Sequence, residues 1–347
     1  MAETEPAPQA RRSGSRIRQV EPVWSRRRFL QETGLTTAMA VGLGLVGYWA
    51  YSPEAVRQKR QEILTLKDFR VAATSLHPAL VVVRGAVVET MVREAVAALG
   101  GMGRFIQKGD TVLLKPNVGW DRQPEQAANT SPEVVAAVAK VCREAGAGAV
   151  WVTDCSINDP HRSFARSGIE SAAQQVGAVV KLPGGDDFRQ TNLQGTVLKV
   201  WPVARFFHQV DKVINLPVVK QHSLSGCTLA MKNWYGILGG QRNQLHQNIH
   251  TSIVDLAAAL RPTLTIVDAT RVLKRNGPSG GSLDDVAQEN TLLAGLDEVA
   301  LDSYALRFLE LNVAQVPYLA MAETRGLGKT DWRTLQWVER QVGGAGG

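Results

Sequence analysis

Short apolar strands alternate with helical patterns through most of this 347-residue chain, and this alternation constrains the fold more than any other feature. The strand-like stretches are almost entirely apolar, which is typical of strands buried on both faces. We therefore predict an α/β fold in which a mainly parallel, Rossmann-like sheet is covered by helices on both faces. The predicted strands are 79–84, 111–114, 149–153, 178–182, 196–201, 212–216, 264–267 and 291–294, and the predicted helices are 88–99, 132–145, 169–176, 253–260 and 298–311.

Several of these strands end in a polar residue that can take part in chemistry. Lys115 and Asn117 follow one strand, and Asp154, Asn215 and Asp268 each end another. In open parallel sheets, ligands bind in the crevice beyond the carboxyl ends of the strands. A single strand-ending Asp is usually a turn or cap residue, but four polar strand ends together predict one shared ligand site.

The segment 215–240 has the composition of a site wall, because it carries lysines and amides but no acidic residue. Lys220, His222, Lys232 and Asn233 fall within it, and with Lys115 they would suit a carboxylate or phosphate. We take Lys115, Lys220, His222 and Lys232 as catalytic candidates, with lysine or histidine acting as acid or base. The alternative is that the lysines are solvated and that His222 caps a turn.

His246 and His250 have the i, i+4 spacing that places two imidazoles on one face of a helix. Such a pair can bind a divalent metal if Asp154, Asp268, His222 or Cys227 completes the ligand set. The HExxH motif is absent, so a surface pair of histidines is the alternative. The loop NGPSGG begins with Asn276 and Gly277, which we expect to border the crevice as ligand-binding residues together with the amides at positions 117, 215 and 233.

Composition excludes some classes of function. The net charge of +7 is concentrated in residues 1–31, which carry seven arginines and three glutamates, so nucleic-acid binding is not expected. Three cysteines without a CxxC pair cannot supply the four thiolates of an ordinary iron–sulfur cluster. Cys142 fits a core helix, whereas the sequence leaves the roles of Cys155 and Cys227 open.

The N-terminus carries an export pattern. Residues 25–31 read SRRRFLQ and precede an uncharged stretch to residue 52, which resembles a twin-arginine signal read by the Tat translocase. Residues 1–24 are expected to be a disordered tail. The stretch 33–51 would span about 28 Å as a helix, enough for an uncleaved membrane anchor. Cleavage near Ala50 and Ser52 is the alternative, and either outcome predicts a periplasmic or extracytoplasmic protein.

Collinear motifs in the body of the chain resemble the DUF362 family. They are KPN (115–117), NTSPE (129–133), EAGAGAVWVTD (144–154), NLPVVKQH (215–222), MKNWYGILGG (231–240), TIVDA (265–269), NGPSGG (276–281) and DEVALDSYA (297–305). The resemblance implies one α/β domain over 79–330, distantly similar to the substrate domain of lactate racemases. A linker (53–78) and a C-terminal tail (331–347) would flank it. Some relatives carry cysteine clusters that this chain lacks, so their iron–sulfur chemistry is not implied.

Two functions from different classes fit these observations. The first is an exported enzyme, with or without a metal, acting on a small anion in the Lys/His/Asp crevice. The second is a non-catalytic, membrane-tethered binding or assembly factor for a redox or envelope complex. Electron transfer through an iron–sulfur cluster would require a cluster shared between subunits.

Overall fold

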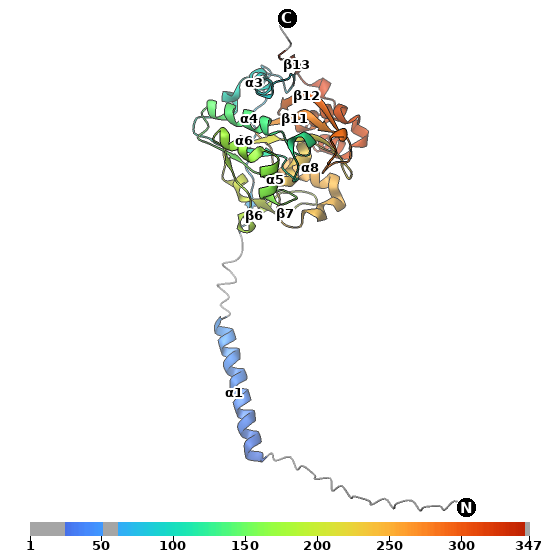
Figure 1. Cartoon of the computed structure of the whole chain (residues 1–347). Coiled ribbons are helices and arrows are strands. Elements are labelled where there is room, and N and C mark those ends of the chain that lie inside the picture. Colours follow the sequence, from blue (N-terminus) through green and yellow to red (C-terminus); the bar gives the residue numbers. More distant parts are fainter. Residues whose placement is uncertain (1–24, 51–61, 344–347) are drawn as a thin grey trace, which may run out of the picture. The chain divides into compact units, whose positions relative to one another are not determined.

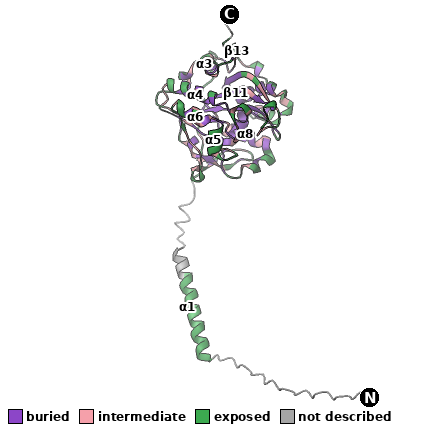
Figure 2. Cartoon of the chain, in the orientation of Figure 1, coloured by how far each residue is buried: buried purple, intermediate pink, exposed green. Residues whose placement is uncertain are grey.

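The computed structural model describes residues 25–50 and 62–343, which belong to two units, 1–60 and 61–347 (Figure 1). The expected disordered tail (1–24) and the first part of the expected linker lie outside the described residues. In the first unit, helix α1 (Arg26–Ala50) begins inside the arginine run, and its residues 26–44 are all exposed (Figure 2).

Helix α1 covers the stretch expected to anchor the protein. Its first turns are charged, and glycine and threonine interrupt its apolar residues. In the part of the chain that the structure describes, no helix combines the length and hydropathy needed to cross a membrane. This finding differs from the transmembrane helix expected from the sequence.

The second unit is built on a ten-stranded sheet. Along its main path, with the order β13-β2-β12-β11-β8-β3-β4-β5, only β12 runs antiparallel to its neighbours among the described strands. Strand β9 pairs in parallel with β11 and forms a hairpin with β10. The strands are β2 (Leu80–Arg84), β3 (Thr111–Pro116), β4 (Ala149–Val152), β5 (Val179–Val180), β8 (Lys212–Leu216), β9 (Val218–His222), β10 (Gly226–Thr228), β11 (Leu264–Leu273), β12 (Val286–Gly295) and β13 (Trp337–Gln341).

Two hydrophobic cores lie on opposite faces of this sheet. Successive residues of a strand point to opposite faces, so Val213 belongs to one core and Ile214 to the other. One face is covered by α3 (Val88–Ala98), α4 (Pro132–Glu144), α5 (Pro160–Arg166) and α6 (Ile169–Gln175). The other is covered by α7 (Ala230–Asn233), α8 (Ile249–Ala259), α9 (Glu298–Ala305) and α10 (Pro317–Thr324). The predicted α/β class, a mainly parallel sheet covered on both faces, is confirmed.

Several boundaries differ from the sequence prediction. Strands β11 and β12 each have ten residues, because they pair with each other antiparallel along almost their whole length. The predicted helix 298–311 ends as α9 at Ala305 and continues as a 3₁₀ turn, Leu306–Leu309.

The two flanks of the predicted domain also contribute to the fold. Within the expected linker, β1 (Leu64–Thr65) joins a second sheet with β6 (Phe188–Asn192) and β7 (Val200–Ala204). Within the expected C-terminal tail, β13 pairs in parallel with β2 at the edge of the main sheet. Trp337 of β13 packs edge-on against Trp332, with ring centres 4.9 Å apart, and this apolar contact helps to hold β13 against the second unit.

Candidate functional site

A cleft of about 530 Å³ opens where β3, β4 and β9 end. Its size is that of a small-molecule site. The loops after β3 and β4, the β9–β10 hairpin and the segment from α7 to residue 246 form its walls. Its lining includes eight residues that the sequence singled out: Lys115, Asn117, Asp154, Lys220, His222, Lys232, Asn233 and His246.

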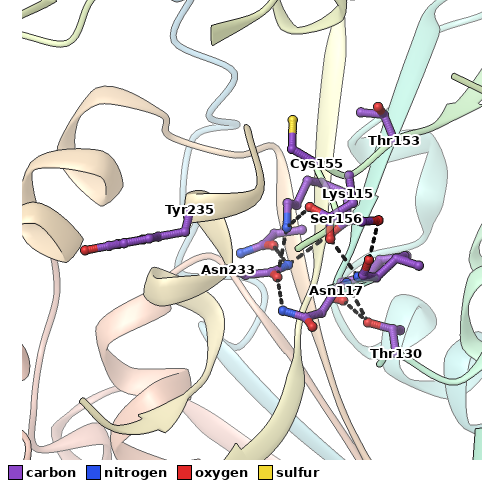
Figure 3. Close-up of polar contacts among 12 residues, drawn as sticks. Lys115, Asn117, Thr130, Thr153, Cys155, Ser156, Asn233 and Tyr235 are labelled. Atoms are coloured by element: carbon purple, nitrogen blue, oxygen red, sulfur yellow. Dashed lines mark hydrogen bonds and ion pairs between the residues drawn. The ribbon is translucent and has the colours of Figure 1, made fainter. Parts of the chain in front are cut away.

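The floor of the cleft is organised by a buried ion pair between Lys115 and Asp154, whose Nζ and Oδ1 atoms are 2.8 Å apart. Lys115 is the penultimate residue of β3 and Asp154 follows the neighbouring parallel strand β4, so the register of the two strands brings them together. Lys115 Nζ also donates to Asn233 Oδ1 at 2.9 Å, and Asn117 Nδ2 donates to the same oxygen at 2.9 Å (Figure 3). Burial lowers the pKa of Lys115, while Asp154 opposes that effect.

Lys220 is fully buried in β9 but has no carboxylate partner among the described residues. Its Nζ donates to Asn117 Oδ1 at 2.9 Å and to the Ala128 carbonyl at 2.5 Å. These acceptors are neutral, so the charge of an ammonium here is not balanced. Burial, reinforced by the positive charge of Lys232, lowers the pKa of Lys220 well below its ordinary value.

Lys232 is the second buried lysine without a carboxylate partner in the described part of the chain. Its Nζ lies 4.9 Å from the centre of the Tyr235 ring. Burial lowers the pKa of Lys232 to about 8. His222 is buried beside these lysines, and burial together with Lys232 and Lys220 lowers its pKa to about 2, so its imidazole is neutral near pH 7.

The segment that carries Lys232 and Asn233 is held from behind by α9. Asp302 accepts hydrogen bonds from the amides of Ala230 and Met231, at 2.7 and 3.1 Å, at the start of α7. Glu298 accepts from Trp234 Nε1 at 3.0 Å and from Asn215 Nδ2 at 2.7 Å.

Asn215 in turn accepts from Asn233 Nδ2 at 2.8 Å. Asn215 therefore positions a cleft residue from behind and does not line the cleft itself.

Gly236 lets the chain pass close to the ion pair. A methyl group on its Cα would overlap Asp154 Oδ1 and lie 2.5 Å from Lys115 Nζ. Only glycine leaves room for this close contact, which explains why a glycine follows Tyr235 in the segment 215–240.

The expected metal ligands do not meet. His246 lies in a 3₁₀ helix (Arg242–Asn248), whereas His250 lies in α8, and Asn248 with φ −129° breaks the helical path between them. The His246 ring lies 6.4 Å from that of His222, and the His250 ring lies 6.2 Å from that of Tyr318. The i, i+4 spacing therefore does not put the two imidazoles on one face.

Neither predicted aspartate completes a metal site with them. Asp154 is paired with Lys115, and Asp268 accepts hydrogen bonds from the Ser131 amide at 2.7 Å and the Thr270 hydroxyl at 2.7 Å. Asp268 lies in the middle of the long strand β11 and does not line the cleft. Across residues 25–50 and 62–343, no group of three His, Cys, Asp or Glu side chains could hold a metal ion.

The remaining predicted residues lie at the edge of the site. Asn276 Nδ2 donates to Asp285, and the Gly277 amide donates to the side chain of Gln221 at 2.8 Å. The loop therefore reaches the cleft through Pro278, not through these two residues.

Sequence reasoning missed Arg242. Its guanidinium donates to the carbonyls of Cys155, Ser156 and Tyr235, at 2.7 to 3.2 Å, and so ties two walls of the cleft together. No local pattern marks such an arginine, because two of its three acceptors, the carbonyls of Cys155 and Ser156, lie 87 and 86 residues away in the sequence. The Cys155 thiol also lines the cleft, and burial raises its pKa to about 12.

Comparison with known proteins gives a family match and a distant fold similarity. The family described as "Domain of unknown function (DUF362)" matches residues 112–307. The chain is 32% identical over 254 residues to a protein of Synechocystis sp. named thylakoid-associated protein, covering 69% of this chain and 75% of that protein.

Among solved structures, a Thermotoga maritima protein matches at 11% identity with a TM-score of 0.37, covering 70% of this chain and 60% of that one. The lactate racemase apoprotein of Thermoanaerobacterium thermosaccharolyticum matches at 12% identity with a TM-score of 0.38, covering 72% of this chain and 61% of that one. The chain thus spans about three fifths of these two structures.

Proposed function

The chain belongs to the DUF362 family, and from the chemistry of its cleft we propose that it binds a small anionic molecule there. One observation carries the proposal. Three lysines line the buried floor, and only Lys115 has a carboxylate partner among the described residues. Burying an unpaired cation costs several kcal/mol. An anion placed between Lys220 and Lys232 would remove that cost, and the amides of Asn117 and Asn233 would lie beside it.

Calorimetric titration of the full-length protein with acetate and with inorganic phosphate, at low ionic strength and pH 7, tests this proposal. Binding should weaken at least tenfold in Lys220→Met and in Lys232→Met, because each variant removes one cation at nearly constant side-chain volume. Lys199→Met, at an exposed position just before β7, should bind as the wild type does. Binding that is equal in all four proteins would refute the site, as would no binding of either anion.

The same amines make acid–base catalysis the second candidate function. Lys115 is fixed by Asp154, and His222 is held neutral, so Lys220 and Lys232 are the groups best suited to move a proton. A pKa of about 8 places Lys232 near the range that general acid–base catalysis needs. Deuterium incorporation next to the carboxylate of phenylacetate in D₂O, followed by NMR, would support it. Equal incorporation in Lys220→Met and Lys232→Met would refute it.

Export through the twin-arginine route is the proposed path to the site of action. The order SRRRFL over residues 25–30 supports it, as does the relative named thylakoid-associated protein. Fractionation of cells that express the full chain tests it. The double variant Arg26→Lys, Arg27→Lys should remain in the cytoplasm, whereas Arg28→Lys should be exported. Equal export of both variants would rule the route out.

A further inference from the structure

The rim of the cleft differs chemically from its floor. Ile157 and Leu224 line the cleft, yet they are 59% and 57% exposed, among the large apolar side chains most open to solvent in the second unit. Half-buried Trp120 and Pro278 line the same opening. The cations, by contrast, are buried below. The cleft is therefore charged at its base, and part of its mouth is apolar, beside the exposed polar residues Ser223, Gln241 and Asn243.

The apolar rim is held in place by its backbone. The amide of Ile157 donates to the Gly119 carbonyl at 2.9 Å, and the Ser156 hydroxyl donates to the Val118 carbonyl at 2.6 Å. On the other side, Leu224 sits at the tip of the β9–β10 hairpin, and its amide donates to His222 Nδ1 at 3.1 Å. The backbone of both residues is thus fixed beside the opening.

The volume of the cleft exceeds what a small inorganic anion needs. At about 30 Å³ for each water, 530 Å³ corresponds to roughly 18 water molecules. An anion that touched only Lys220 and Lys232 would leave most of this space, and the whole apolar rim, in contact with water.

The donors on the floor favour a carboxylate head group. Arg242, which could grip a phosphate with two parallel hydrogen bonds, already donates to three backbone carbonyls. Lys115 is neutralised by Asp154. Two lysine ammonium groups therefore remain, and they can each donate to one oxygen of a carboxylate.

We propose that the ligand is an amphiphilic monocarboxylate, with its carboxylate between Lys220 and Lys232 and its apolar body against Trp120, Ile157 and Leu224. This inference rests on the proposed anion site and names the chemical class that the site takes. The apolar body would cover the side chains that the fold leaves exposed, and removing that surface from water would supply affinity.

A chain-length series tests the inference in the full-length protein. Acetate, butyrate, hexanoate and octanoate, each below its micelle concentration, are titrated by calorimetry at pH 7. Burial of a methylene is worth about 0.8 kcal/mol, so affinity should rise about two- to fourfold for each methylene added. Octyl phosphonate serves as the matched ligand with a different head group.

Variants of the rim and the floor separate the contribution of the ligand's apolar body to affinity from that of its carboxylate. Ile157→Ser and Leu224→Ser should each weaken octanoate about tenfold and leave acetate unchanged, because these side chains are exposed and their loss does not disturb the core. Lys220→Met should weaken both ligands. Leu283→Ser, 59% exposed and outside the cleft, is the control and should change neither.

The outcomes distinguish this inference from the anion site on which it rests. Acetate binding that depends on Lys220 without any gain from chain length would overturn the amphiphile and keep the anion site. Octanoate binding that is unchanged in Ile157→Ser and Leu224→Ser would also overturn the amphiphile and keep the anion site. Tighter binding of octyl phosphonate than of octanoate would overturn the carboxylate assignment. Failure of every ligand would overturn the anion site itself.

Discussion

Replacing Lys232 with methionine should make the protein more stable while weakening the proposed anion binding at least tenfold. The pKa of Lys232 falls from 10.5 to about 8 because the ammonium is buried. Since one pKa unit is worth about 1.4 kcal/mol, the charged side chain costs the folded state about 3 kcal/mol at pH 7. Methionine has a similar volume and no charge. It gives up only the contact of the cation with the Tyr235 ring, worth about 1 kcal/mol, so we expect a net gain of about 2 kcal/mol.

The pH dependence of the stability difference between Lys232→Met and the wild type gives a sharper test than the size of that difference at a single pH. Below pH 8 the lysine is protonated in both the folded and the unfolded state, and the full cost of its charge is present. Between pH 8 and 10.5 the folded amine loses its proton while the unfolded one keeps it, so the unfolded state binds more protons and stability rises with pH. The difference in unfolding free energy between Lys232→Met and the wild type should therefore shrink from about 2 kcal/mol at pH 7 towards zero or below at pH 10.5.

Urea denaturation at pH 7, 8, 9 and 10, followed by tryptophan fluorescence, measures this difference. Taking the difference between the two proteins cancels the titrating groups that Lys232 does not influence, whereas Lys220, whose pKa is lowered by the charge of Lys232, does not cancel and adds to the difference. Lys199→Met, which replaces an exposed lysine, should differ from the wild type by less than about 0.5 kcal/mol at every pH. A loss of stability in Lys232→Met at pH 7, or a difference that does not change with pH, would refute the reasoning that Lys232 is an uncompensated buried cation.

Three further substitutions test how the site and its support are built. Gly236→Ala should destabilise the protein by about 3 kcal/mol in thermal unfolding, because the new methyl group overlaps Asp154. Glu298→Ala should cost roughly 2–4 kcal/mol in urea denaturation, because it leaves the Trp234 indole without its buried acceptor, and Glu298→Gln should recover part of that loss. Asp255 is buried, which raises its pKa, but hydrogen bonds from three amides and a guanidinium lower it overall. The stability that the Asp255 carboxylate contributes should be present above about pH 4 and lost as pH falls. Asp255→Asn should therefore lower the free energy of unfolding by about 2 kcal/mol at pH 7 and by less near pH 2.

Matched controls accompany these variants. Gly103→Ala introduces a methyl group with no atom within 4 Å, and Glu125→Ala and Asp186→Asn change exposed carboxylates. The free energy of unfolding of each control should lie within about 0.5 kcal/mol of that of the wild type. An unchanged melting temperature in Gly236→Ala, full stability of Glu298→Ala, or an effect of Asp255→Asn that grows on acidification would contradict the corresponding argument.

The sequence alone predicted the α/β class and most of the elements that carry the site. Apolar runs of strand length, such as 111–114 and 212–216, reveal buried parallel strands because burial on both faces leaves no room for polar residues. The polar residues at the ends of such runs, Lys115 and Asp154 among them, lie at the same edge of the sheet because the strands are parallel.

Where the prediction failed, the deciding contacts join residues far apart in the chain. Pairing with β12 extends β11 to Leu273 and leaves Asp268 in mid-strand, away from the cleft. A change from 3₁₀ to α-helix separates His246 from His250. Local periodicity contains neither piece of information.

The electrostatic character of the site is the clearest case of a property decided by tertiary structure. Lys115, Lys220 and Lys232 look alike in the sequence, where each is one lysine near a strand or a turn. The register of β3 and β4 gives Lys115 a carboxylate, while packing buries the other two without one. Charge balance depends on distance and on exclusion of water, and both are set only when separate segments of the chain pack together.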